Sequence, residues 1–219
     1  RLCRVSSEIR EIRVGLGGGN DTLIHDVGDS ESIQTFIPGR VMSVSMGSGN
    51  DRVQTRINGF SFEAAPELQA LGPGSWVIHY DLGSGNDQST IEINADFLGL
   101  QRESEVIDSI FSLGVMGGGG NDVIEVNAVR ALASELSQVE FILRGGSGND
   151  VLAVRSSDSW SVEEATVSIE RYGDAGNDRF FGLLAFDQAG DSEVVQHLDT
   201  GSGNDTVTTT FWNRTKRRV

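Results

Sequence analysis

Short alternations of apolar and polar residues flank seven Gly-Asn-Asp tripeptides along this chain. When the tripeptides are aligned on their aspartates, the residues nine and seven positions earlier are mostly apolar and the residue between them is mostly polar, as in Ile12-Arg13-Val14. The residue two positions after the aspartate is apolar in six of the seven cases. A period of two is typical of a strand with one buried face. Each tripeptide is therefore predicted to join two strands through a tight, glycine-rich turn.

The tripeptides are an architectural repeat. Shuffling 28 Gly, 11 Asn and 17 Asp would give about a tenth of one such tripeptide, whereas the sequence has seven. Successive aspartates are separated by 30, 36, 35, 28, 28 and 27 residues. A unit of that length cannot bury its apolar strand face alone, so it must stack on the next unit. We expect residues 1–219 to form a single all-β domain, a parallel β-helix or β-solenoid of about seven coils with one stacked Gly-Asn-Asp turn per coil.

Stacked turns bring seven carboxylates to one edge at strand spacing, about 4.8 Å. Like charges at that separation repel each other, so a cation is expected among them. Calcium suits such a site, because it takes six to eight oxygen ligands from carboxylates and backbone carbonyls. The candidate ligands are the aspartates Asp21, Asp51, Asp87, Asp122, Asp150, Asp178 and Asp205, the glycines Gly19, Gly49, Gly85, Gly120, Gly148, Gly176 and Gly203, and the asparagines Asn20, Asn50, Asn86, Asn121, Asn149, Asn177 and Asn204. One ion between each pair of successive turns gives up to about six Ca²⁺.

The turn sequences resemble a known calcium-binding repeat. "GGGGNDVIE" at 117–125 and "GGSGNDVLA" at 145–153 match every position of the nonapeptide G-G-x-G-x-D-x-U-x of RTX (repeats-in-toxin) proteins. Three other motifs lack only the first Gly, "LGSGNDQST" also has Ser89 at the apolar position, and "GDAGNDRFF" has Asp174 in place of the second Gly. The resemblance implies calcium bound by the aspartate side chains and by carbonyls of Gly and its neighbours.

The arrangement of the motifs differs from that of RTX β-rolls, which run the nonapeptide in tandem. Here each motif stands alone in a longer coil, which is similar to the long GxGND regions of secreted bacterial surface proteins. The resemblance therefore carries over the turn and its calcium, but neither the short β-roll coil nor toxin activity.

The composition of the chain argues against several classes of protein. A net charge of −15 is the opposite of what nucleic-acid binding requires, and the one basic cluster, at 214–218, is expected to be a solvated chain end. No run of 18 apolar residues is present, so no membrane span is predicted. A single cysteine, Cys3, excludes an intramolecular disulfide framework. Because the chain begins at Arg1, we interpret it as a piece of a longer secreted or surface-exposed protein.

Residues outside the turns form no catalytic signature. His79 and His197 share a register but belong to coils roughly 19 Å apart, and both are expected to face outward, while His25 has no histidine or cysteine nearby in sequence. Aromatic side chains in the coils are expected in the core or stacked between coils; they are Trp76, Trp160, Trp212, Phe60, Phe62 and Phe211. Glu163, Glu164 and Glu170 are expected on a solvated strand edge, and "RALASELS" at 130–137 could hold a helical turn. No enzyme is predicted.

The sequence favours an extracellular calcium-binding structural or adhesive β-solenoid whose folding is coupled to the metal. Expected partners are calcium, a second copy of the chain stacked end to end, or a cell-surface polysaccharide. Two alternatives stay open. One is a calcium-stabilised β-helix polysaccharide lyase or epimerase, although a single Lys and two Tyr count against it. The other is a self-assembling filament subunit, because a β-helix exposes unpaired strands at its ends.

Overall fold

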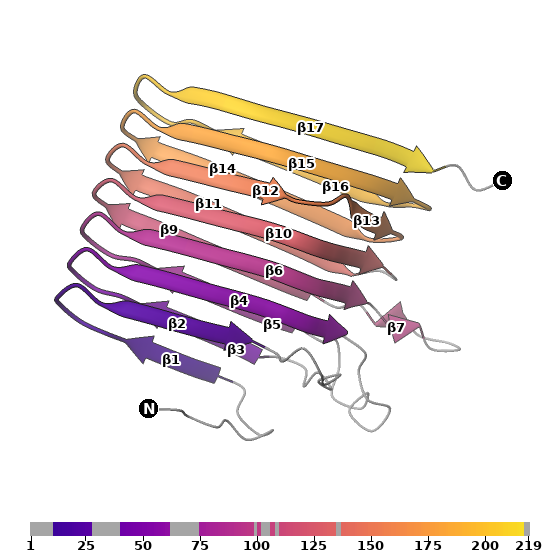
Figure 1. The fold of residues 1–219 in the computed structure, drawn as a ribbon, viewed down its shortest axis with the longest axis horizontal. Helices are drawn as coiled ribbons and strands as arrows, with labels where there is room; N and C mark the ends of the chain where they lie inside the picture. Colours follow the sequence, from indigo (N-terminus) through magenta and orange to yellow (C-terminus); the bar gives the residue numbers. More distant parts are fainter. Residues whose placement is uncertain are drawn as a thin grey trace.

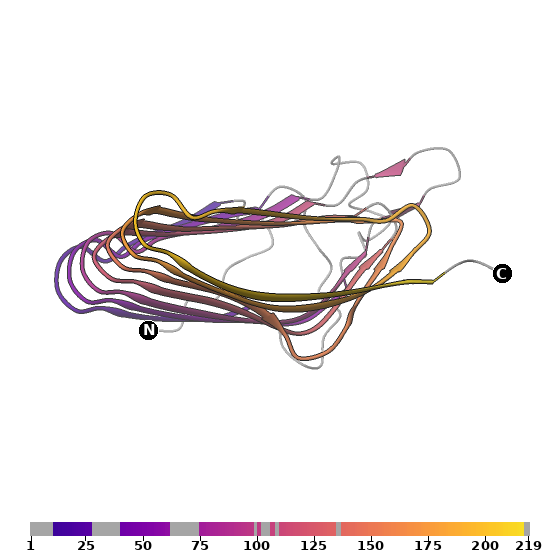
Figure 2. The same ribbon diagram turned by 90° about the horizontal axis from the view of Figure 1, so that it is seen from above.

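The computed structural model describes residues 11–27, 40–61, 75–98, 100–101, 106–107, 110–134 and 137–216. Within these ranges the chain contains strands and no helix, and it winds into a parallel β-solenoid of about six full windings (Figure 1). The predicted fold class is confirmed. Each coil supplies a strand to each of two facing sheets, and the Gly-Asn-Asp turns connect the sheets along one edge (Figure 2).

The first sheet holds the strands that lead into the turns. Its seven strands run in the order β1-β3-β5-β9-β11-β14-β16, and every neighbouring pair is parallel. The strands are β1 (Glu11–Gly15), β3 (Arg40–Ser45), β5 (Ser75–Asp81), β9 (Ile110–Gly119), β11 (Gln138–Ser147), β14 (Thr166–Ala175) and β16 (Glu193–Asp199).

The second sheet holds the strands that leave the turns, and its eight strands are also parallel. They are β2 (Thr22–Val27), β4 (Arg52–Ser61), β6 (Gln88–Leu98), β10 (Val123–Ser134), β12 (Val151–Ser156), β13 (Trp160–Glu163), β15 (Arg179–Ala189) and β17 (Thr206–Lys216). In the fifth coil one strand is split into β12 and β13, which pair with the same neighbours, β10 and β15. A short antiparallel pair, β7 (Leu100–Gln101) and β8 (Val106–Ile107), lies outside both sheets.

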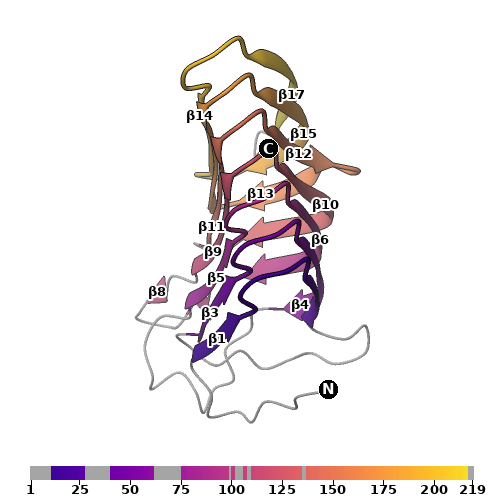
Figure 3. The same cartoon turned by 90° about the vertical axis from the view of Figure 1, so that its left-hand side faces the viewer.

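The core lies between the two sheets, which Figure 3 shows facing each other from the side of the turns. Strands β9, β11 and β14 alternate buried and half-buried residues, as the period of two predicts. An aromatic stack runs along the core through five consecutive ring contacts with centroid distances of 5.5–6.5 Å. Its members are Trp76, Phe111, Phe141, Trp160, Phe186 and Phe211. Stacking between coils, predicted for Trp76, Trp160 and Phe211, is thus confirmed.

Polar side chains enter the core near each end of the stack. Tyr80 is fully buried, and its hydroxyl lies 2.9 Å from His25 Nδ1 and 2.8 Å from Thr55 Oγ1. At the other end, the buried guanidinium of Arg171 donates to the Phe181 carbonyl and to Gln196. Buried polar groups need such partners, so these bonds help to fix which coil stacks on which.

Some local expectations were wrong. Residues 130–134 continue strand β10 and form no helical turn. Trp212 is 67% exposed on β17, outside the core. Cys3, residues 62–74 and the side chain of Phe60, for which the sequence also raised expectations, lie outside the described parts of the chain.

His197 is exposed, as expected for an outward position, and its ring centroid lies 5.4 Å from that of Tyr172.

Candidate metal-binding turns

The seven turns superpose because glycine occupies the two positions where neighbouring coils touch. The glycine before each Asn-Asp pair has φ between 120° and 146°, which side chains rarely allow. A Cβ on Gly120 would lie 1.6 Å from the carbonyl oxygen of Gly85 in the preceding coil. The glycine two residues earlier is equally close to its neighbour in most coils, and Asp174 replaces it in the sixth, at φ 68°.

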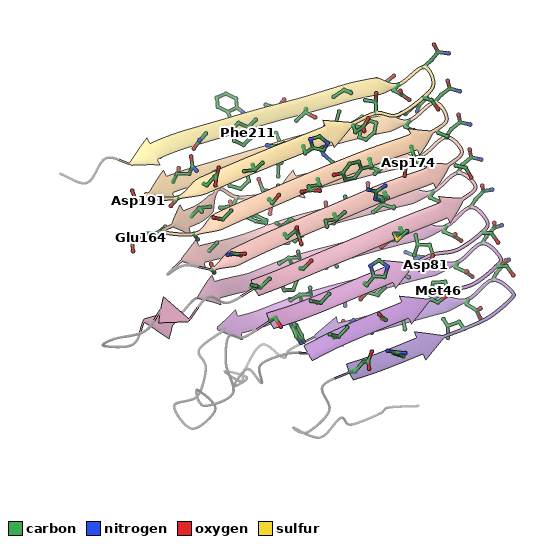
Figure 4. All side chains as sticks on the ribbon, turned by 180° about the vertical axis from the view of Figure 1, so that it is seen from behind. Met46, Asp81, Glu164, Asp174, Asp191 and Phe211 are labelled. Carbon is green, nitrogen blue, oxygen red and sulfur yellow. The ribbon has the colours of Figure 1, made fainter. Side chains whose placement is uncertain are left out.

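The asparagines form a ladder on the outside of the turns. The backbone N–H of each asparagine donates to Oδ1 of the asparagine in the preceding coil, at 2.7–2.9 Å. All seven are exposed, and a row of side chains is visible along this edge in Figure 4. The asparagine oxygens are therefore already used to tie one coil to the next.

The aspartates form a second ladder on the inside of the turns, and it runs in the opposite direction. The backbone N–H of each aspartate donates to Oδ1 of the aspartate in the next coil, at 2.7 or 2.8 Å. The five central aspartates are 0–2% exposed; they are Asp51, Asp87, Asp122, Asp150 and Asp178. The carboxylates thus face the end of the core, where water does not reach them.

One oxygen of each buried carboxylate has no protein partner. Oδ2 is buried without a hydrogen bond in six successive coils; the residues are Asp21, Asp51, Asp87, Asp122, Asp150 and Asp178. A buried polar atom without a partner is costly, and a buried charge more so. A proton or a cation beside each carboxylate would relieve this cost along the whole row.

The residue five positions before each aspartate is called the floor position. Backbone carbonyl oxygens approach the aspartate carboxylate beside this residue. Gly117 occupies it in the fourth coil, and the point where its Cβ would lie is 2.5 Å from Asp122 Oδ2 and 2.4 Å from the Gly145 carbonyl oxygen. In the sixth coil, the corresponding point beside Gly173 is 2.5 Å from Asp178 Oδ2 and 2.4 Å from the Thr200 carbonyl oxygen. A carboxylate oxygen and a carbonyl oxygen of the next coil therefore share one small space, a donor set that suits a hard cation.

Burial alters the acidity of the ladder. The pKa of Asp122 and of Asp150 is raised to about 6, mainly by desolvation and also by neighbouring carboxylates, although the hydrogen bond from a backbone amide acts in the opposite direction. Desolvation also raises the pKa of Asp87 and of Asp178. The charged ladder is therefore destabilised at neutral pH unless a positive charge joins it.

This shift predicts an acid-stabilised fold when metal is absent. The folded state binds more protons than the unfolded state between about pH 4 and pH 6, so stability in chelator falls as pH rises through that window. Asp122 and Asp150 should each contribute on the order of 2 kcal/mol at pH 4 that is lost by pH 7. Urea unfolding in EDTA at pH 4.5, 5.5 and 7.0 measures the trend. In the double variant Asp122→Asn/Asp150→Asn the trend should flatten, and an equal slope in both proteins would contradict the assignment.

The sequence predicted Gly, Asn and Asp of each motif as ligands of one ion, but in the structure the Asn and Asp side chains lie on opposite sides of the turn. The structure brings all seven aspartates into one row, as expected, yet it turns the asparagine side chains to the exposed side of the same turns. The floor glycines were missed as ligand positions. The sequence feature that could have revealed them is the first Gly of the two complete nonapeptides. A side chain at that position would lie against the aspartate carboxylate. Metal binding by any of these residues stays a prediction.

Other groups in the described residues do not form a metal centre of their own. In those ranges, no three His, Cys, Asp or Glu side chains gather closely enough to hold an ion by themselves. A cation at the turns would therefore depend on backbone carbonyls in addition to the aspartates. Across the same ranges, no helix is long and apolar enough to span a membrane.

Comparisons of the chain with protein families, with characterised proteins and with solved structures found no match.

Proposed function

We propose that this chain is a calcium-binding structural β-solenoid. The observation that carries the proposal is the row of six buried aspartate Oδ2 atoms without hydrogen-bond partners. Each carboxylate lies next to the carboxylate of the following coil, to which it is linked through a backbone amide. At an effective dielectric of about 20, neighbouring charges at strand spacing repel by about 3 kcal/mol. A dication between coils removes this repulsion and gives Oδ2 a partner.

The donor chemistry favours calcium. In the fourth and sixth coils, a carboxylate oxygen and a backbone carbonyl oxygen both approach the space beside the aspartate, and the described contacts of His25 and His197 lie elsewhere in the coils. Oxygen-only sites suit calcium or magnesium, whereas zinc prefers nitrogen and sulfur. Calcium tolerates irregular sets of six to eight oxygens, while magnesium requires a regular octahedron and retains water. A site closed by two stacked backbone turns fits calcium better.

Binding at this position couples the metal to folding. The aspartate and the carbonyl oxygens of one site come from different coils, so the site exists only when the coils are stacked. We place the protein outside the cell, where calcium at about 1 mM matches the affinity typical of extracellular modules. A structural or adhesive role follows, because an elongated scaffold that becomes rigid on export needs no catalytic group.

A specific observation favours one competing function, a metal-free scaffold stabilised by acid. With its pKa raised to about 6, a carboxyl such as Asp150 can lose its charge by binding a proton instead of calcium. The two functions predict opposite responses to the same substitution when calcium is present.

The variant Asp150→Asn separates them. Asn keeps an oxygen that can accept the Asp122 N–H and removes the buried charge. In EDTA at pH 7 the variant should be more stable than the wild type by about 1–3 kcal/mol, because the repulsion is relieved. In 2 mM calcium it should be less stable than the wild type, because a ligand is lost. Urea unfolding in both buffers measures the difference. A variant that is more stable in both buffers would support the metal-free scaffold and contradict calcium binding.

A further inference from the structure

The ladder is not uniform at the floor position. Reading along the chain, its residues are Leu16, Met46, Leu82, Gly117, Gly145, Gly173 and Thr200. Three successive coils have glycine there, and the coils before them have large apolar side chains. Every aspartate in the row belongs to the same hydrogen-bond ladder, whereas the floor residue beside it differs between coils.

In the glycine coils, the aspartate carboxylate occupies the room that a side chain would take. The Cβ of a residue at 145 would lie 2.5 Å from Asp150 Oδ2 and 2.9 Å from Asp150 Cγ. At 117 and 173, a carbonyl oxygen of the next coil also lies 2.4 Å from the corresponding point, and at 173 a carbon of the Phe180 ring lies 3.0 Å from it. The carboxylate therefore faces backbone oxygens, which can complete a ligand set.

In the second and third coils, the floor position carries a large apolar side chain in place of glycine. Met46 and Leu82 are both 0% exposed and belong to the hydrophobic core, and Figure 4 shows Met46 beside the turn edge. Asp51 Oδ2 and Asp87 Oδ2 are buried there without partners. A cation entering these coils would be surrounded on one side by methyl and methylene groups, which cannot replace its hydration shell.

We propose that only the three glycine-floored coils hold calcium, and that Met46 and Leu82 close the corresponding space in the second and third coils. This inference rests on the proposed calcium-binding function and makes it specific: the ions lie at Asp122, Asp150 and Asp178. The aspartates of the apolar coils are structural, tying coils together through Oδ1. The solenoid is thus divided into a metal-dependent part and a part whose turns are sealed by apolar side chains.

The number of bound ions tests the selective occupancy of the turns and the proposed calcium-binding function separately. Native mass spectrometry and equilibrium dialysis of the full chain in 2 mM calcium should find three ions with similar affinity. Five or six ions would overturn the selective occupancy while leaving calcium binding intact. No ions would overturn the proposed function itself.

Two substitutions locate the ions. Gly145→Ala places a methyl group against Asp150 and should lower the count from three to two. Gly15→Ala is the matched control, because a Cβ there meets no atom within 4 Å, and it should keep three ions. An unchanged count in folded Gly145→Ala protein, judged by circular dichroism, would contradict the assignment.

Replacing an apolar floor residue by glycine tests the proposal independently if Gly145→Ala fails to fold. Leu82→Gly opens the third coil and should raise the count to four. Leu82→Ala removes most of the same hydrocarbon but retains the Cβ that blocks the carboxylate, so it should still bind three. If both variants bind the same number of ions, the floor position does not control occupancy and the proposal is wrong.

Discussion

Replacing Gly120 by Ala is expected to prevent the solenoid from forming a continuous stack. The new Cβ would lie 1.6 Å from the carbonyl oxygen and 2.5 Å from the carbonyl carbon of Gly85, and the backbone at 120 has φ 131°. Both atoms belong to the backbone of the neighbouring coil, so no side chain can rotate away. Strained backbone alone costs about 1–3 kcal/mol, and separating the two coils breaks the adjacent ladder bonds as well. We expect the free energy of unfolding to fall by more than about 4 kcal/mol, a loss that urea unfolding will measure.

The adjacent residue supplies a matched control. A Cβ on Gly119 meets only the hydroxyl of Ser147, at 3.4 Å, and the corresponding residues in other coils include Ser48, Ser84 and Ala175, which all carry a Cβ. Gly119→Ala should therefore change the free energy of unfolding by less than about 1 kcal/mol. Similar stability losses in the two variants would show that the coils do not approach each other as described.

Removing calcium is expected to have the second large effect. For three sites with a dissociation constant of about 0.1 mM, 1 mM free calcium adds about 1.4 kcal/mol per site, or roughly 4 kcal/mol in total. For a chain of 219 residues this corresponds to a Tm roughly 8–16 °C higher in calcium than in EDTA. Thermal unfolding followed by circular dichroism in the two buffers measures the shift.

Magnesium at the same concentration is the control for this experiment, since it adds equal ionic strength and charge. It should raise Tm by much less than calcium, because the closed backbone turns do not offer its octahedral geometry. Equal shifts with both ions would indicate screening of a net charge of −15, without specific sites. The absence of any shift at pH 7 would overturn metal binding.

The sequence by itself determined the architecture. Seven tripeptides at intervals of 27–36 residues, with apolar residues nine and seven positions earlier, require a stack of strand-turn-strand units. The observed register confirms this: residues aligned on their aspartates pair directly, as Phe141 does with Leu113 and Ile169. Repeats are predictable because each unit makes the same contacts with its neighbour, so one pattern specifies every interface. The variable returns carry no such pattern, and the strand through residues 130–134 was not foreseen for that reason.

Only the tertiary structure decided which way the turn side chains face. Asn121 and Asp122 are adjacent in sequence, yet one is exposed and the other has no exposed surface. Because neighbouring residues of an extended chain point to opposite sides, a one-residue difference separates the outer ladder from the inner one. The importance of Gly117 likewise emerges across space, since it faces Asp122 and the carbonyl of Gly145 in the next coil. A sequence pattern shows that the residues recur, whereas stacking determines which oxygens converge and which are left without a partner.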